Sequence, residues 1–251
     1  MSVATQHELG ILLRNIAESL DISDTQYKEA IQHYEVIGKF LNEEDSPIAQ
    51  YGPEIYSQGS FRLGTMIKPI TDTEEYDIDL VCELKELRKE RVTQKVLKDM
   101  VGDRLKEAEG RLFRKLEPGK RCWTLDYAKS TRFHMDILPA IPDHDTGDLA
   151  RWVGASRAST GILITDKQVR EWQRSNPVGY AEWFKEQMQV QLYERRLEMA
   201  ERLRASVEEV PEYLVKTPLQ RAIQILKRHR DRMFRYDPDH KPISIIISTL
   251  A

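Results

Sequence analysis

The sequence lacks the features of an exported or membrane-spanning protein. Its 251 residues include two cysteines, Cys82 and Cys122, too few for a disulfide framework, and both lie in apolar runs typical of buried free thiols. The N-terminus has no basic or long apolar signal region, and no run of about 18 apolar residues occurs, as a spanning helix would need. We therefore expect a cytoplasmic protein with no membrane association.

An excess of positive charge is also absent. The 38 lysines and arginines are balanced by 41 aspartates and glutamates, which gives a formal net charge of −3 at pH 7. Proteins that bind nucleic acid through a broad surface carry a large positive excess. We therefore expect no stable nucleic-acid binding, and any contact with nucleotides must be local.

The chain also lacks a polar C-terminal tail. It stops at the apolar run from Ile245 to Ala251, whereas a domain normally ends in solvated residues. We therefore expect the sequence to be a portion of a longer protein. With 40% hydrophobic and 31% charged residues, it is still long enough to bury a core.

Hydrophobic periodicity predicts the order of the elements. In chain order they are helices over residues 11–20 and 27–41, a strand over 76–82, a helix over 86–109, strands over 122–127 and 133–139, and helices over 177–203 and 218–236. The two later strands are joined by a polar turn at 129–131, and Pro139 and Pro142 end the second of them. We expect them to form an antiparallel pair beside the first strand. This order predicts an α+β fold with a small mixed sheet.

The last two predicted helices begin with recognisable capping signals. Asn176-Pro177 fits an N-cap followed by proline, and Thr217 with Gln220 fits a capping box. Apolar residues at helical spacing predict the buried face of each helix. These are Trp183, Val190 and Leu197 on the first, and Leu219, Ile223, Leu226 and Met233 on the second.

A Gly-Ser turn is the first motif along the chain that indicates a functional site. It lies in the stretch from Gln58 to Thr65, around Gly59 and Ser60. Glycine permits a tight turn in which backbone N–H groups approach an anion, and a serine at a helix start adds a hydroxyl beside the positive end of the helix dipole. This combination suits a triphosphate, although a Gly-Ser turn by itself is more typical of a solvated loop.

Two aspartates follow on the first predicted strand. Asp77 and Asp79 are two residues apart and therefore point to the same side of the sheet, where they repel each other unless a cation lies between them. By itself this pattern is typical of a solvent-facing strand. Its order and spacing after the Gly-Ser turn favour a metal site instead.

Asp136 is the predicted third carboxylate. It lies within an apolar strand, between Met135 and Ile137, where an unpaired carboxylate is costly and a bound metal explains it. The nearby acids Asp126, Asp143 and Asp145 are alternatives, and His134 lies on the Asp136 side of the strand with no role assigned. Three carboxylates from adjacent strands can hold two Mg²⁺ ions, as phosphoryl or nucleotidyl transfer requires.

These motifs resemble a known family. Gly59-Ser60, Asp77-x-Asp79 and a later strand aspartate are similar to the signature of the DNA polymerase β-like nucleotidyltransferases, and the fuller stretches 58–65 and 76–81 resemble the bacterial cGAS/DncV-like branch. The resemblance extends from the N-terminal helices to Ala251. It implies a cytoplasmic enzyme that joins nucleoside triphosphates, ATP or GTP, into a cyclic di- or trinucleotide second messenger. Pyrophosphate is released, and the product activates an effector protein in antiphage defence.

The resemblance also implies a role for each site residue. Gln58, Gly59 and Ser60 would hold the triphosphate, and Asp77, Asp79 and Asp136 would hold two Mg²⁺ ions, with Mn²⁺ as a substitute. In this family a lysine on a later helix and a serine shortly beyond it also grip the triphosphate, and Lys227 and Ser244 match best. Lys227 has an alternative role as an ion-pair partner of Asp231, and Ser248 is the alternative to Ser244.

The expected organisation has three parts, and two alternative functions remain open. Residues 1–45 would be N-terminal helices packed on the core, 46–165 the nucleotidyltransferase catalytic core, and 166–251 an incomplete helical lobe. A template-independent RNA 3′-end nucleotidyltransferase shares the motifs, but it needs a long basic groove, against which the net charge of −3 argues. An inactive nucleotide-binding relative would have no need of three repelling carboxylates.

Overall fold

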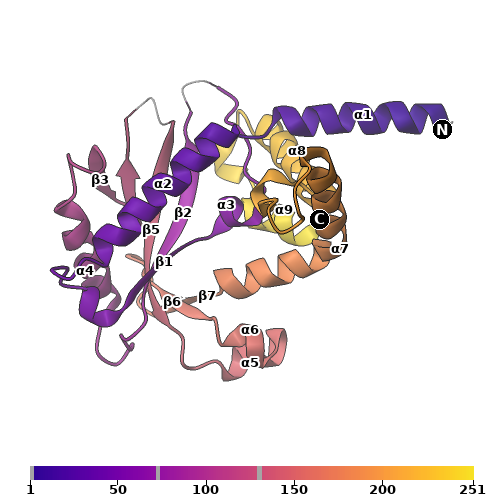
Figure 1. Ribbon diagram of the computed structural model, residues 1–251. Coiled ribbons are helices and arrows are strands. Elements are labelled where there is room, and N and C mark those ends of the chain that lie inside the picture. Colours follow the sequence, from indigo (N-terminus) through magenta and orange to yellow (C-terminus); the bar gives the residue numbers. More distant parts are fainter. Residues whose placement is uncertain (1–2, 72–73, 129–131) are drawn as a thin grey trace. The chain divides into compact units, whose positions relative to one another are not determined.

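The computed structural model describes residues 3–71, 74–128 and 132–251, so the predicted turn at 129–131 lies outside the described residues (Figure 1). The chain forms two compact units, neither of which is continuous in sequence. The sheet unit comprises Thr25–Phe61 and Pro69–Trp183, and the helical unit comprises Met1–Asp24, Arg62–Lys68 and Phe184–Ala251. The proposed domain boundaries after residues 45 and 165 stay a prediction.

The elements follow the predicted order. The helices are α1 (Val3–Ser19), α2 (Asp24–Leu41), α3 (Gly59–Leu63), α4 (Gln94–Lys106), α5 (Gly147–Val153), α6 (Ala155–Ala158), α7 (Pro177–Leu203), α8 (Pro218–Met233) and α9 (Ser244–Leu250). The strands are β1 (Pro53–Ser57), β2 (Tyr76–Leu84), β3 (Lys115–Pro118), β4 (Trp123–Asp126), β5 (Phe133–Pro142), β6 (Ile162–Ile164) and β7 (Gln173–Ser175). The predicted α+β class is confirmed.

A parallel pair of strands, β2 and β5, forms the centre of the sheet. The strand order is β1-β2-β5-β4-β3, with β6 also paired to β5 and β7 to β6. All pairings other than β2 with β5 are antiparallel, so the predicted antiparallel pair of β4 and β5 beside the first strand is confirmed. The β2–β5 register sets Asp79 opposite Asp136 and Asp77 opposite His134.

Helices α2 and α4 cover one face of the sheet (Figure 1). His33 of α2 packs edge-on against Tyr127 and Phe133, with ring centroids 4.5 and 5.4 Å apart. The indole of Trp123 donates a hydrogen bond of 2.8 Å to the Lys98 carbonyl of α4. Alternate strand residues are buried on this face, namely Ile78, Leu80, Leu125, Met135 and Ile137. Because side chains alternate along a strand, this burial turns the intervening polar residues to the opposite face.

Two predicted boundaries are wrong in the sheet unit. The helix expected over 86–109 covers only Gln94–Lys106, because Thr93 caps its start by accepting the Val96 N–H at 3.3 Å. Pro139 lies within β5, which continues to Pro142. A proline is tolerated there because Pro139 falls between the residues that pair with β4 and those that pair with β6.

The capping signals of the helical segments are confirmed, but their predicted buried faces are only partly right. Both hydrogen bonds of the Thr217 capping box are present at the start of α8, and Ile223 is buried as predicted, yet Leu226 and Met233 are exposed. On α7, Val190 and Leu197 are also exposed, and the buried residues include Phe184, Met188 and Leu192. Among the described helices, none is both long and apolar enough to cross a membrane.

Apart from Ile223, the buried side chains of α8 are polar. Their amide and ammonium groups satisfy carbonyls at the end of α3 and in the segment that follows it. Gln220 donates to the Leu63 carbonyl at 2.9 Å, Lys227 to that of Thr65 at 3.1 Å, and Gln224 to that of Met66 at 2.9 Å. Backbone carbonyls that have no partner in regular structure require such donors, which explains why three of the four buried side chains of α8 are polar.

A buried lysine on α4 gives the sheet unit a characteristic pH response. Lys98 is 3% exposed, and its ammonium donates to the Gly119 carbonyl at 2.7 Å. Burial, followed by the charge of nearby Lys167, lowers the pKa of Lys98 to about 8. Between pH 8 and about 10.5 the unfolded chain therefore binds more protons than the folded one, and the contribution of Lys98 to stability rises with pH.

We predict that Lys98→Met removes this rise. The native free energy of unfolding should gain on the order of 2 kcal/mol relative to the variant as the pH increases through that range. Urea unfolding at several pH values measures the difference. Lys95→Met is the control, because Lys95 is exposed on the same helix and its hydrogen bond with Asp99 raises its pKa. Equal slopes for native and Lys98→Met proteins would contradict the prediction.

Candidate active site

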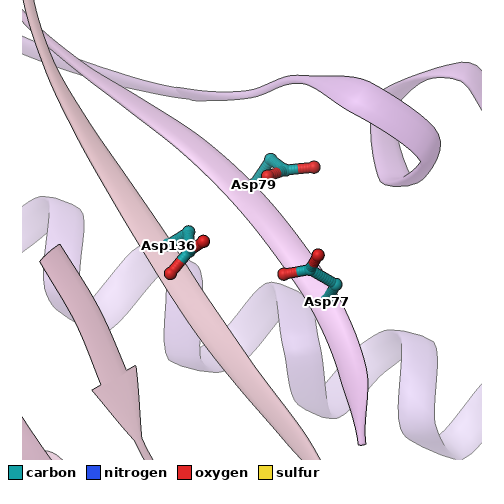
Figure 2. Close-up of side chains that lie close together, drawn as sticks. All are labelled: Asp77, Asp79 and Asp136. Atoms are coloured by element: carbon teal, nitrogen blue, oxygen red, sulfur yellow. The ribbon is translucent and has the colours of Figure 1, made fainter. Parts of the chain in front are cut away.

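Three carboxylates gather on the face of the two central strands opposite α2 and α4, as Figure 2 shows. Asp77 and Asp79 come from β2, and Asp136 comes from β5. One oxygen of each lies within 4.8 Å of the others. The structure therefore brings together the three aspartates that the sequence singled out, and it does so through the parallel register of β2 and β5.

The alternative acids are engaged elsewhere. Asp126 forms an ion pair with Arg114. Asp143 and Asp145 both pair with Arg174, at 2.8 and 3.1 Å. These contacts leave Asp136 as the third member of the cluster.

A histidine offsets part of the repulsion among the carboxylates. The Nε2 atom of His134 lies 3.1 Å from a carboxylate oxygen of Asp77, and its Nδ1 lies 3.5 Å from Glu75. The hydrogen bond with Asp77 is the largest factor that raises the pKa of His134, to about 9, so the ring is cationic at neutral pH in the metal-free protein. The only signal for this role in the sequence is the position of His134 on the Asp136 side of its strand.

The Gly-Ser turn lies directly against Asp79. The Gln58 N–H donates to the Asp79 carbonyl at 2.9 Å, and Gly59 has a positive φ of +60°. A Cβ atom on Gly59 would lie 2.5 Å from Asp79 Oδ2, closer than any real contact. Glycine is thus required here both by the backbone conformation and by the carboxylate. Ser60 follows as the second residue of α3.

Comparison with known proteins identifies this part of the chain. Residues 53–139, which hold both the Gly-Ser turn and the carboxylates, match the family described as "Cyclic GMP-AMP synthase DncV-like, nucleotidyltransferase domain". These residues form a DncV-like nucleotidyltransferase domain. The resemblance inferred from the motifs is confirmed.

The similarity to individual proteins extends beyond the DncV-like domain. The chain is 34% identical over 245 residues to a c-di-GMP synthase of Roseivirga ehrenbergii, covering 95% of this chain and 58% of that protein. It is 22% identical over 257 residues to the cyclic dinucleotide synthase CdnG of Bradyrhizobium diazoefficiens, covering 97% and 58%. The chain therefore spans less than two thirds of either relative.

A solved structure supports the fold. The structure of CdnG from Bradyrhizobium diazoefficiens in complex with GTP has a TM-score of 0.70 with this chain at 21% identity, covering 94% of this chain and 67% of that one. At this identity the likeness concerns the fold alone. It agrees with the small mixed sheet and flanking helices described above.

The carboxylates of the DncV-like domain fit a metal ion. All three offer oxygen ligands, which hard divalent cations prefer, and their separation suits a shared ion. Because Gly59 has no Cβ, Asp79 Oδ2 can occupy the space beside it, so the Gly-Ser turn and the carboxylate cluster are in direct contact. Asp77, Asp79 and Asp136 could therefore hold a metal ion.

The two remaining predicted residues belong to the helical unit, outside the DncV-like domain. Lys227 is 3% exposed, and its ammonium lies 3.1 and 3.2 Å from the carbonyl and hydroxyl oxygens of Thr65. Ser244 is the first residue of α9 and accepts a hydrogen bond of 2.8 Å from Arg230. Ser248 is buried and donates to the Ser244 carbonyl at 3.2 Å. Their contact with a triphosphate stays a prediction.

We predict that Gly59→Ala weakens metal binding at least about tenfold, the cost typical of disturbing groups that support a metal ligand. The new methyl group would displace the Asp79 carboxylate. Binding of Mn²⁺ to the purified protein, followed by electron paramagnetic resonance, measures the effect.

Gly110→Ala is the matched control. Gly110 also has a positive φ, +76°, but apart from its chain neighbours no atom of the described residues lies within 4 Å of the Cβ position. Both variants incur the cost of a left-handed alanine, about 1 kcal/mol of stability, which urea unfolding reports. Only Gly59→Ala should change the affinity for Mn²⁺, and equal affinities in the two variants would contradict the assignment of Asp79.

Proposed function

We propose that the protein is a Mg²⁺-dependent nucleotidyltransferase that joins two nucleoside triphosphates into a cyclic dinucleotide. The observation that carries the proposal is the cluster of Asp77, Asp79 and Asp136 against the Gly59-Ser60 turn. Metal ligands beside a phosphate-binding turn are what this chemistry needs. The cyclic dinucleotide synthases among the relatives support the proposed product.

The reaction would proceed in two equivalent rounds. In each, a ribose hydroxyl oxygen bonds to the α-phosphorus of the other nucleotide, the bond from that phosphorus to the bridging oxygen breaks, and pyrophosphate leaves with release of the hydroxyl proton. Mg²⁺ held by the three aspartates would lower the pKa of the hydroxyl and offset the charge of the triphosphate. The second round closes the ring.

The residues of the chain would act mainly by positioning. Gln58, Gly59 and Ser60 would bind phosphate oxygens through backbone N–H groups and the serine hydroxyl. Because α3 has only five residues, its dipole is small, and these hydrogen bonds would contribute more than the helix end. Lys227 and Ser244 would complete the triphosphate site. Fixed groups of this kind accelerate phosphoryl-type transfer by orientation and charge stabilisation.

The relatives suggest substrates and a biological role. GTP is the first candidate substrate because the 34% identical relative is named a c-di-GMP synthase, and ATP is the second. We infer that the cyclic product acts as a second messenger that activates an effector protein in antiphage defence. Nucleoside triphosphates are cytoplasmic metabolites, so we also propose that compartment.

The test is product formation by the full-length protein. With Mg²⁺ and all four radiolabelled nucleoside triphosphates, we expect a phosphatase-resistant product with the mass of a cyclic dinucleotide. Asp77→Ala should lower the rate roughly 1000-fold, because a metal ligand is lost. The variant should stay folded without metal, since one of three repelling charges is removed. Asp103→Ala, which changes an exposed aspartate on α4, should keep full activity. Full activity in folded Asp77→Ala would refute the metal assignment.

The alternatives give different results in the same preparation. Linear additions to an RNA primer, with salt-dependent binding of tRNA or poly(A) in a gel shift, would indicate an RNA 3′-end nucleotidyltransferase. Calorimetric binding of ATP without turnover would indicate an inactive nucleotide-binding relative.

A further inference from the structure

Asp136 lies between two strands whose side chains affect its negative charge in opposite ways. On β2 its register partner is Asp79, another carboxylate. On β4 its register partner is Thr124, whose hydroxyl lies 2.5 Å from Asp136 Oδ1. Directly opposed residues in a sheet are close enough for such side-chain contacts. Asp136 is therefore repelled from one side and offered a hydrogen bond from the other.

The hydroxyl of Thr124 must be the donor in this contact. An ionised carboxylate can only accept hydrogen bonds, and bonds from hydroxyl groups to carboxylates are short, about 2.5–2.7 Å. Burial, followed by the charge of nearby Asp136, raises the pKa of the Cys122 thiol to about 11, so this thiol also lies on the β4 side of Asp136. The carboxylate is thus anchored from the β4 side.

The hydrogen bond from Thr124 fixes the last side-chain torsion of Asp136, which otherwise varies widely. Rotation of an aspartate carboxylate about its last bond has a broad, two-fold preference, so the strand does not determine which way the oxygens face. A donor at Oδ1 sets the plane of the carboxylate and leaves the lone pairs of the second oxygen for a cation. The repulsion from Asp79 would otherwise turn the carboxylate out of the cluster.

We propose that Thr124 is a positioning residue for Asp136, holding its carboxylate in the orientation that binds the metal ion. Thr124 acts through Asp136 and does not itself contact the ion. This inference rests on the proposed metal-dependent function, and it identifies a residue outside the acidic cluster that supports the affinity for metal.

Metal binding by the full-length, metal-free protein tests the inference directly. Thr124→Val removes the hydroxyl but keeps the branched shape that suits a strand. Thr124→Ser keeps the donor and loses a methyl group. We expect Thr124→Val to weaken Mn²⁺ binding by about 10- to 100-fold, the range for groups that orient metal ligands. Thr124→Ser should stay within about threefold of the native protein, because the donor remains.

The control is a buried threonine of the same unit. Thr165 is 1% exposed and donates to the Arg121 carbonyl at 2.7 Å. Thr165→Val loses a side-chain hydrogen bond, so it should unfold at a lower urea concentration than the native protein with no change in Mn²⁺ affinity. If Thr124→Val does not fold, Thr124→Ala makes the same comparison without the added methyl group.

The outcomes distinguish a failure of the Thr124 role from a failure of the proposed function. Native affinity for Mn²⁺ in folded Thr124→Val or Thr124→Ala overturns the role of Thr124, as does an equal loss in the serine and valine variants. A native protein that binds Mn²⁺ but makes no cyclic product overturns the proposed function and leaves the Thr124 comparison valid. A native protein that binds no Mn²⁺ overturns both.

Discussion

Mutual repulsion of three carboxylates is the constraint around which the sheet unit is organised. Oxygen atoms of Asp77, Asp79 and Asp136 lie within 4.8 Å of one another. Like charges at this distance repel by about 1–3 kcal/mol per pair, depending on how much water screens them. The backbone does not relieve this cost, because the parallel register of β2 and β5 holds Asp79 opposite Asp136. The surrounding residues instead offset it locally.

The repulsion at each aspartate is offset by a different neighbouring residue. The imidazolium of His134 faces Asp77, the hydroxyl of Thr124 faces Asp136, and the absent side chain of Gly59 gives Asp79 room beside the turn. None of these partners removes the negative charge of the cluster. They keep it concentrated and oriented, which is the state a cation would stabilise most.

Strand alternation made the acidic cluster predictable, whereas its partners were not. Asp77 and Asp79 reveal their shared face by period two, and Asp136 by its apolar neighbours. The contacts of Thr124 and His134 depend on the register between strands, which periodicity within one strand does not contain. Hydrophobic spacing on α8 identified Ile223 as buried but failed at Leu226 and Met233 for a related reason. The buried polar side chains of α8, including Gln224, donate hydrogen bonds to backbone carbonyls of another segment of the chain. The need for these donors cannot be read from the sequence of α8 alone.

Because β2 and β5 pair in parallel, the cluster forms only when these two strands are in the correct register. A slip of one residue would turn Asp136 toward the apolar face, and a slip of two would set Asp79 opposite His134 or Leu138. The sheet that has slipped by two residues would keep its strands and the faces of its side chains, so spectroscopy of secondary structure would barely distinguish it from the native one. Affinity for a divalent cation is therefore a sharper gauge of native strand alignment in this protein than its content of helix and strand.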